Sequence, residues 1–300
     1  GIHELLTTDT FVGFFGQDKN LLPGGRYRPL SLITFAIENQ LWGMNPMLGH
    51  LINVLLYAFL CLLIFKILSM FFPPGKEKWF ISFAFVTAVL FTAHPIHTEV
   101  VANIKGRDEL LGWLGAFGTL YFCLRFLKKS NLLLLPLISV LFFLGLLSKE
   151  SVITFFVIIP ASLFFFTKAS LKQYIQIIVF LIFSVIMFLV MRDIALGNKL
   201  PVEETELLNN PFLNAAVIQK YATIMLTWGK YLLLLLFPHP LTHDYYPKQI
   251  PIIGFYNIRA ILPLLIYVFF IVYMIWKFMK KDVIAFAIMF FGLTFSVTSK

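Results

Sequence analysis

The sequence predicts an all-α fold, a polytopic transmembrane helical protein, and three observations support this prediction. The chain has 300 residues, of which 59% are hydrophobic and only 13% are charged. Apolar runs long enough to cross a bilayer recur along most of its length. Short basic loops separate some of these runs, whereas most acidic residues lie in other loops. We therefore expect about eight spans, together with helices that lie at the membrane interface.

The apolar runs define the expected spans and the organisation of the chain. Each is near the length that a tilted span requires. The runs cover residues 47–72, 79–93, 110–127, 132–147, 151–167, 175–191, 260–276 and 283–298. We expect one membrane domain over 1–300, with an outer loop at 1–46, six spans in 47–191, a large outer loop at 192–259 and two spans in 260–298.

The basic loops predict the orientation of the chain. The stretches "PPGKEKW", "RFLKKS", "TKASLKQ" and "KFMKKD" are short and basic, so we expect them to face the cytoplasm. On this topology the histidines and nearly all acidic residues, Glu77 and Asp282 excepted, lie on or near the outer face. We therefore expect chemistry on the non-cytoplasmic side. The net charge of +9 does not indicate nucleic-acid binding, because the basic residues form no continuous patch.

Two segments are expected to form helices that do not cross the bilayer. Residues 30–41 place Leu30, Ile33, Ile37 and Leu41 on one helical face and polar residues on another, which is typical of a helix in the outer interface. Residues 211–238 are long enough to cross. One crossing there would move "KFMKKD" to the outside, so we expect an outer-leaflet or re-entrant helix.

The stretch "HPIHTEVVANIKGRDE" is the strongest candidate for a functional site. His94 and His97, three residues apart, precede Glu99, and Arg107 and Glu109 follow in the same outer loop. This combination of acid, base and cation suits an active site, but it also suits a loop that caps helices and contacts lipid headgroups. A zinc site is a third reading, although the spacing matches no established metal signature.

Three shorter stretches add charged candidates. In "GGRYRPLS", Arg26 and Arg28 could hold a phosphate or contact lipid headgroups nonspecifically. In "LLSKESV", Lys149 and Glu150 could pair with each other, or the lysine could bind an anionic substrate. In "PHPLTHDYYP", Asp244 stands beside aromatic residues of the kind that anchor membrane interfaces. The cysteines Cys61 and Cys123 lie inside apolar runs and are expected to be packing residues.

These stretches, in this order, resemble the membrane portion of the transmembrane and tetratricopeptide-repeat proteins. The resemblance covers residues 20–160 well and 238–250 more loosely, and its most specific part is HPxHxE followed by the Arg and acid pair. That family is similar to the C-type glycosyltransferases, which move a sugar from a polyprenyl-phosphate donor to an acceptor outside the cytoplasm. Its eukaryotic members are associated with O-mannosylation of protein Ser or Thr from dolichyl-phosphate mannose.

The resemblance implies roles for individual residues. His94, His97, Glu99 and Glu109 are implied as catalytic-site residues, in which the glutamates position the donor or acceptor and the histidines shape the site. Binding of the donor phosphate is implied for three further residues, which are Arg28, Arg107 and Lys149. Asp244 matches less closely, as an acceptor-contacting or structural residue. The family's main catalytic acid is expected before Gly1 and its repeat domain after Lys300, so we expect this chain to be a segment of a longer protein.

The resemblance also implies partners and a location. We expect a lipid-linked sugar donor as co-substrate, a protein acceptor, a lipid bilayer, no nucleic acid and no certain cofactor, with a divalent metal left open. The protein is expected in the bacterial inner membrane or the endoplasmic reticulum. Two alternatives stay open, which are a transporter or lipid flippase and a noncatalytic membrane scaffold. A transporter would carry ionisable residues near the middle of its spans, and these runs nearly lack them.

Overall fold

The computed structural model describes residues 2–10, 26–75, 78–197, 212–213, 215–242 and 249–298. All regular elements in these ranges are helices, which confirms the all-α membrane fold. Contacts divide the chain into two compact units, Gly1–Pro201 and Val202–Lys300, and each is described by itself. The single domain expected over 1–300 stays a prediction.

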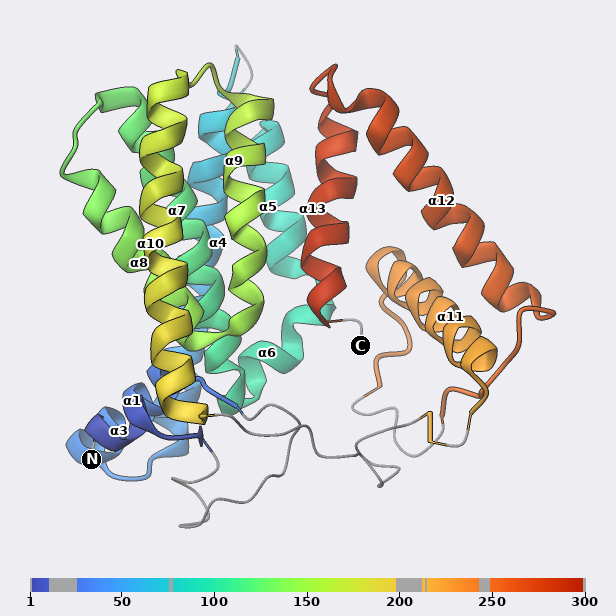
Figure 1. The fold of residues 1–300 in the computed structure, drawn as a ribbon, viewed down its shortest axis with the longest axis horizontal. Coiled ribbons are helices and arrows are strands. Elements are labelled where there is room, and N and C mark those ends of the chain that lie inside the picture. Colours follow the sequence, from blue (N-terminus) through green and yellow to red (C-terminus); the bar gives the residue numbers. More distant parts are fainter. Residues whose placement is uncertain are drawn as a thin grey trace. The chain divides into compact units, whose positions relative to one another are not determined.

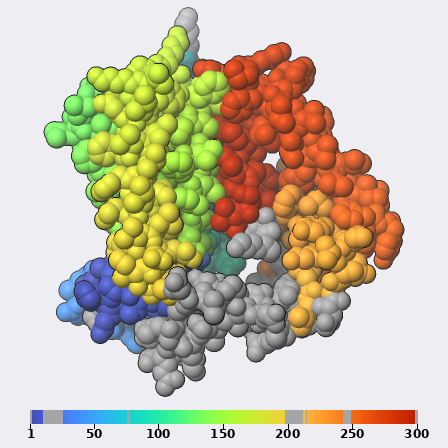
Figure 2. Space-filling view, viewed as in Figure 1, coloured from blue at the N-terminus to red at the C-terminus, as the bar shows by residue number. Residues whose placement is uncertain are grey.

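The first unit is a bundle of apolar helices with shorter helices at one end (Figure 1). Helices α1 (Ile2–Thr7) and α3 (Pro29–Trp42) lie across that end, and α6 (Thr98–Ala102) lies in the loop that leads to α7. The bundle itself contains α4 (Pro46–Phe71), α5 (Phe83–Ala93), α7 (Arg107–Lys129), α8 (Leu134–Ser148), α9 (Phe155–Phe166) and α10 (Leu171–Leu196). In the space-filling view the end of α10 lies against the N-terminal helices (Figure 2).

Every apolar run that predicts a span falls on a helix. Among the described residues, four helical segments are long and apolar enough to cross a membrane by themselves: Pro46–Phe71, Ile104–Lys129, Leu171–Leu196 and Ile258–Phe278. The segments Phe83–Ala93 and Pro95–Ala102 pass this test together but are bent by 51°. The remaining apolar helices are shorter, so the count of eight spans stays a prediction.

Small residues bring α7 and α8 close together. A Cβ atom added to Gly115 would lie 2.5 Å from the Cα of Gly145, and one added to Gly112 would lie 2.9 Å from the Cβ of Lys149. Helices in membranes use such residues because close backbones gain van der Waals contact that lipid cannot replace. Around this contact the bundle is filled by buried apolar side chains, including Phe126 and Phe142.

Helix α3 has its polar face toward the protein. Ser31 and Glu38 are buried, whereas Ile37, Leu41 and Trp42 are exposed. This is the reverse of a helix on a water-soluble protein, and it suits a helix whose outer side meets lipid. The helix predicted over 30–41 is confirmed; of its predicted apolar face, Ile37 and Leu41 are exposed, whereas Leu30 and Ile33 are half-buried.

The second unit contains α11 (Val217–Leu236), α12 (Ile258–Phe278) and α13 (Val283–Thr298). Helix α11 packs on α12, with Gly229 so close to Pro263 that an added Cβ would lie 2.4 Å from the proline Cγ. The hydroxyl of Tyr267 donates to the carbonyl of Trp228 at 3.2 Å. Helix α11 is not among the segments that are apolar enough to cross a membrane alone, and its expected re-entrant position stays a prediction.

Candidate functional site

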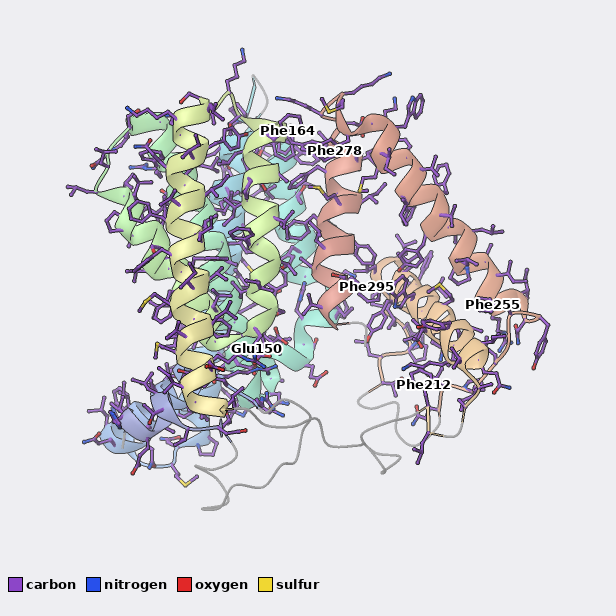
Figure 3. The ribbon with its side chains drawn as sticks, in the orientation of Figure 1. Glu150, Phe164, Phe212, Phe255, Phe278 and Phe295 are labelled. Carbon is purple, nitrogen blue, oxygen red and sulfur yellow. The ribbon has the colours of Figure 1, made fainter. Side chains whose placement is uncertain are left out.

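One end of the first unit collects the charged residues that the motifs single out. We call this the motif end. It carries Arg26 and Arg28 before α3, Asp108 and Glu109 in the first turn of α7, and Lys149 and Glu150 after α8. Figure 3 shows Glu150 at the foot of the bundle, near the end of α10. Residues more than a hundred positions apart therefore meet at one end of the bundle.

Two arginines converge on one carboxylate at the motif end. Arg28 Nη1 donates to Asp108 Oδ2 at 2.8 Å, and Arg26 Nη2 donates to the same oxygen at 3.3 Å. Asp108 is 8% exposed, and the two arginines are 18% and 21% exposed. Burial and the neighbouring Arg28 lower the pKa of Arg26, while Asp108 opposes this shift. Glu150 opposes it as well, so Arg26 interacts with two carboxylates.

Arg28 keeps an unused donor. Its Nε is buried and has no hydrogen-bond partner among the residues that the structure describes. A buried N–H without a partner is costly, because the group has lost its bonds to water. A bound oxyanion that accepts from this nitrogen would remove that cost. This is the clearest indication of a ligand at the motif end.

A second ion pair joins α7 to the segment after α8. Lys149 Nζ donates to Glu109 Oε1. The pair depends on the contact described above, since Gly112 leaves room for the Lys149 stem. Glu150 Oε1 lies 3.8 Å from Arg192 Nε of α10. The negative charge of Glu150 also favours the charged form of Arg26. The motif end thus contains cations and carboxylates that pair with one another.

Arg107 is placed differently from the other predicted phosphate ligands. It is 1% exposed and packs over the ring of Phe35 at 4.1 Å. Its Nη1 donates to Glu38 at 2.6 Å, its Nε to Asn53 at 3.2 Å, and its Nη2 to the carbonyl of Gly49 at 3.3 Å. These bonds join α3, α4 and α7, so Arg107 builds the end of the bundle rather than offering its guanidinium to the surface.

The histidines lie where the chain bends. Pro95 follows His94 and disfavours helical geometry at that residue, which has φ −70° and ψ 122° and ends α5. The ring centroids of His94 and His97 are 6.0 Å apart. The centroid of His97 also lies 4.3 Å from that of Phe91 and 5.8 Å from that of Tyr57. Burial, with a contribution from His94, lowers the pKa of His97 below 6.5. His97 is therefore neutral near pH 7.

Two predicted site residues lie apart from the ion pairs. Glu99 is exposed in the first turn of α6. Asp244 lies outside the described residues. Within the described ranges, no three His, Cys, Asp or Glu side chains are grouped so that they could hold a metal ion.

The sequence prediction grouped Asp108 with Arg107 and Glu109 but gave it no partner, and it gave Glu38 and Asn53 no functional role. Asp108 binds both arginines, while Glu38 and Asn53 hold Arg107. Asn53 is the one of these with a detectable signal, because an amide inside an apolar run is costly unless it has partners. It is fully buried, and its Nδ2 also donates to the carbonyl of Asn103 at 3.1 Å.

Comparison with known proteins gives the following relatives. The chain is 41% identical to Protein O-mannosyl-transferase TMTC1 of Homo sapiens over 88 residues, which are 29% of this chain and 9% of that protein. It is 35% identical to Protein O-mannosyl-transferase TMTC3 of Mus musculus over 94 residues, 30% of this chain and 10% of that protein. Protein O-mannosyl-transferase F38B6.6 of Caenorhabditis elegans is 29% identical over 255 residues, 82% of this chain and 34% of that protein.

The matches thus span about a third or less of the length of these curated relatives. No family model matches the chain. No solved structure matches it either. The named relatives nevertheless agree with the motifs, and they confirm that this chain resembles the transmembrane and tetratricopeptide-repeat family of protein O-mannosyl-transferases.

Proposed function

We propose that the protein carrying this chain is a membrane glycosyltransferase that moves mannose from a polyprenyl-phosphate donor to a Ser or Thr hydroxyl of a protein. The reaction takes place on the non-cytoplasmic face of a membrane, either the endoplasmic reticulum or the bacterial inner membrane, as the resemblance implies. The names of the relatives support mannose transfer to protein. The lipid-linked donor is inferred from the chemistry of the motif end.

The observation that carries this proposal is the pair of arginines at Asp108, one of which has an unsatisfied donor. Arg26 and Arg28 share one carboxylate oxygen, and Arg28 Nε is buried without a partner in the described part of the chain. A phosphate offers several acceptor oxygens and negative charge to such a pair. A polyprenyl phosphate brings that group to the membrane interface, where α3 places its exposed apolar face.

The chemistry requires one bond to form and one to break. The acceptor oxygen attacks the anomeric carbon, the bond from that carbon to the phosphate oxygen breaks, and the hydroxyl proton passes to a base. The donor phosphodiester carries one negative charge, and a second develops on the departing phosphate, so Arg26, Arg28 and Lys149 stabilise the transition state more than the ground state. Lys149 is held by Glu109, which fixes its position.

The remaining residues receive supporting roles. Arg107 positions the site by joining α3, α4 and α7, because its donors are occupied inside the protein. The exposed Glu99 contacts the acceptor. His94 and neutral His97 shape the bend beside it. We assign the main general base to none of these residues.

The test is transfer of labelled mannose from polyprenyl-phosphate mannose to protein, in membranes that contain the intact protein. Arg28→Gln should raise the donor KM or lower kcat by about ten- to a hundredfold, as expected for one lost charge-assisted hydrogen bond. Arg28→Lys keeps the charge and should retain more activity. Lys105→Gln is the control, since Lys105 is an exposed cation in the loop that leads to α7.

Two results would oppose the proposal. If Arg28→Gln and Lys105→Gln behave alike, the motif end does not bind the donor. If the unmodified protein transfers no label from any lipid-linked sugar, the noncatalytic scaffold becomes the better reading. Unfolding temperatures of both variants separate a lost contact from a lost fold.

A further inference from the structure

The other end of the first unit contains a pocket that the proposed function does not use. It lies where α4 and α7 end and where the linker from α9 enters α10. Its volume is about 300 Å³. The lining residues are Met70, Phe71, Leu124, Leu127, Lys128, Thr167, Lys168, Ala169 and Gln173. We call this end of the first unit, with its exposed Lys128 and Lys168, the basic end.

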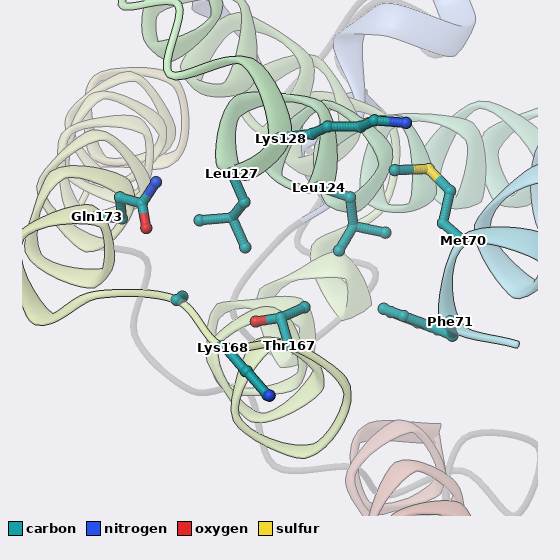
Figure 4. Close-up of a pocket in the computed structure, with 9 residues that line it drawn as sticks. Met70, Phe71, Leu124, Leu127, Lys128, Thr167, Lys168 and Gln173 are labelled. Atoms are coloured by element: carbon teal, nitrogen blue, oxygen red, sulfur yellow. The ribbon is translucent and has the colours of Figure 1, made fainter. Parts of the chain in front are cut away.

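The pocket combines apolar walls with a cationic rim. Leu124 and Leu127 of α7 lie toward Thr167 of the linker, while Lys128 and Lys168 lie on opposite sides of the opening (Figure 4). Both lysines are exposed, and their long side chains can turn toward a ligand between them. The geometry suits a ligand with an anionic head and an apolar body.

The described charged residues near the pocket are of one sign. Lys66, Arg125, Lys129 and Lys172 add to the two rim lysines, and the described residues of 60–75, 78–93, 116–140 and 156–190 include no Asp or Glu. The carboxylates described above belong to the motif end instead. No acidic side chain in these ranges neutralises the rim lysines, so an anion is the complementary partner.

We propose that this pocket binds the headgroup of an anionic phospholipid of the surrounding membrane. The lysines bind the phosphate, and the apolar wall of Met70, Phe71 and the α7 leucines contacts the glycerol and upper acyl region. Basic pockets between membrane helices are suited to such headgroups, because each lysine near the surface attracts anionic lipid. The site is separate from the donor site and does not depend on the proposed function.

A simpler account is that these lysines only orient the chain across the membrane. Orientation depends on the number of basic residues in a loop and requires no pocket. The two accounts differ in one respect, because orientation treats all lysines at the basic end alike. A bound lipid depends on Lys128 and Lys168 specifically.

The experiment is native mass spectrometry of the full chain, reconstituted with phosphatidylglycerol and phosphatidylcholine in equal amounts. The test variant is Lys128→Gln with Lys168→Gln, and the matched control is Lys66→Gln with Lys78→Gln. Lys66 and Lys78 are exposed and do not line the pocket. The test variant should retain about tenfold less phosphatidylglycerol than the unmodified chain, whereas the control should not change.

Three outcomes would overturn the proposal. Equal retention of phosphatidylglycerol by both variants would show that general surface charge attracts the lipid. Equal retention of phosphatidylcholine and phosphatidylglycerol by the unmodified chain would show that the headgroup charge is not recognised. Complete displacement of the lipid by millimolar inorganic phosphate would assign the pocket to a soluble anion. Circular dichroism of each variant confirms that the helices are retained.

Discussion

At the scale of single residues, two arginines of the motif end have opposite surroundings. Arg28 is partly exposed and keeps a buried donor without a partner among the described residues, whereas Arg107 is almost fully enclosed. Both match the family's motif, and both looked like phosphate ligands in the sequence. The burial of Arg107 depends on residues far away in the sequence, such as Glu38. The local motif around Arg107 therefore cannot predict it.

Arg107→Ala should destabilise the protein by about 3–5 kcal/mol, because it leaves Glu38 as a buried charge without its partner. Thermal unfolding in detergent, compared with Lys105→Ala, measures the effect. An unchanged unfolding temperature for Arg107→Ala would contradict the structural role of the Arg107 contacts.

His97 should make stability depend on pH. Burial lowers its folded-state pKa below the ordinary value of 6.5, so between these two values the unfolded chain binds more protons. Its contribution to stability is present above pH 6.5 and is lost as the pH falls through the folded-state pKa. His97→Phe should therefore lose less stability than the unmodified chain between pH 7.5 and pH 5.5. Thermal unfolding at both pH values is the measurement, and equal losses would exclude this residue as a cause.

At the scale of helices, the apolar runs predicted which segments are helical, but their ends differ. The run at 110–127 becomes α7, Arg107–Lys129, because the charged residues placed in the loop form its first turn. The run at 175–191 becomes α10, Leu171–Leu196, which includes polar residues at both ends and begins with the Ser170 and Gln173 capping box. Hydropathy finds the lipid-facing middle of a helix, whereas capping and ion pairs decide where it ends.

The contact of α7 with α8 should be sensitive to one methyl group. Gly115→Ala places a Cβ 2.5 Å from the Cα of Gly145, so the helices must separate, at a cost of about 1–3 kcal/mol. Gly118→Ala is the control, because its Cβ would meet only Leu141 at 3.6 Å, an ordinary contact. We expect Gly115→Ala to lower the unfolding temperature and Gly118→Ala to leave it nearly unchanged. Similar values for the two would mean that α8 moves aside without cost.

At the scale of the whole molecule, the carboxylates described above are separated from the basic end of the first unit, whereas cations are present at both ends. The sequence predicted this separation from loop composition alone, and it also predicted which motifs share an end. It did not pair Asp108 with Arg26 and Arg28, because the partners are 82 and 80 positions apart and no spacing rule links them. The pocket at the basic end could not be predicted either, since three separate stretches of the sequence form it.

The predicted topology places the two ends of the first unit on opposite sides of the membrane. Cysteines introduced at Glu99 and at Lys129, both exposed, should react with an impermeant maleimide from opposite sides of sealed vesicles. The native Cys61 and Cys123 are buried and should give little background. Labelling of both introduced cysteines from one side would contradict the orientation.

The reversed polarity of α3 has a consequence for which donors the protein can use. Its exposed Ile37, Leu41 and Trp42 favour contact with acyl chains, while its buried Glu38 ties it to Arg107. In the proposed function, the helix would set the depth at which the preceding Arg26 and Arg28 lie relative to the lipid phosphates. We expect a water-soluble nucleotide sugar to compete poorly at that depth, even though it carries the same phosphate chemistry. Discrimination between the two donor classes would then come from immersion in the bilayer, with no contact to the polyprenyl chain required.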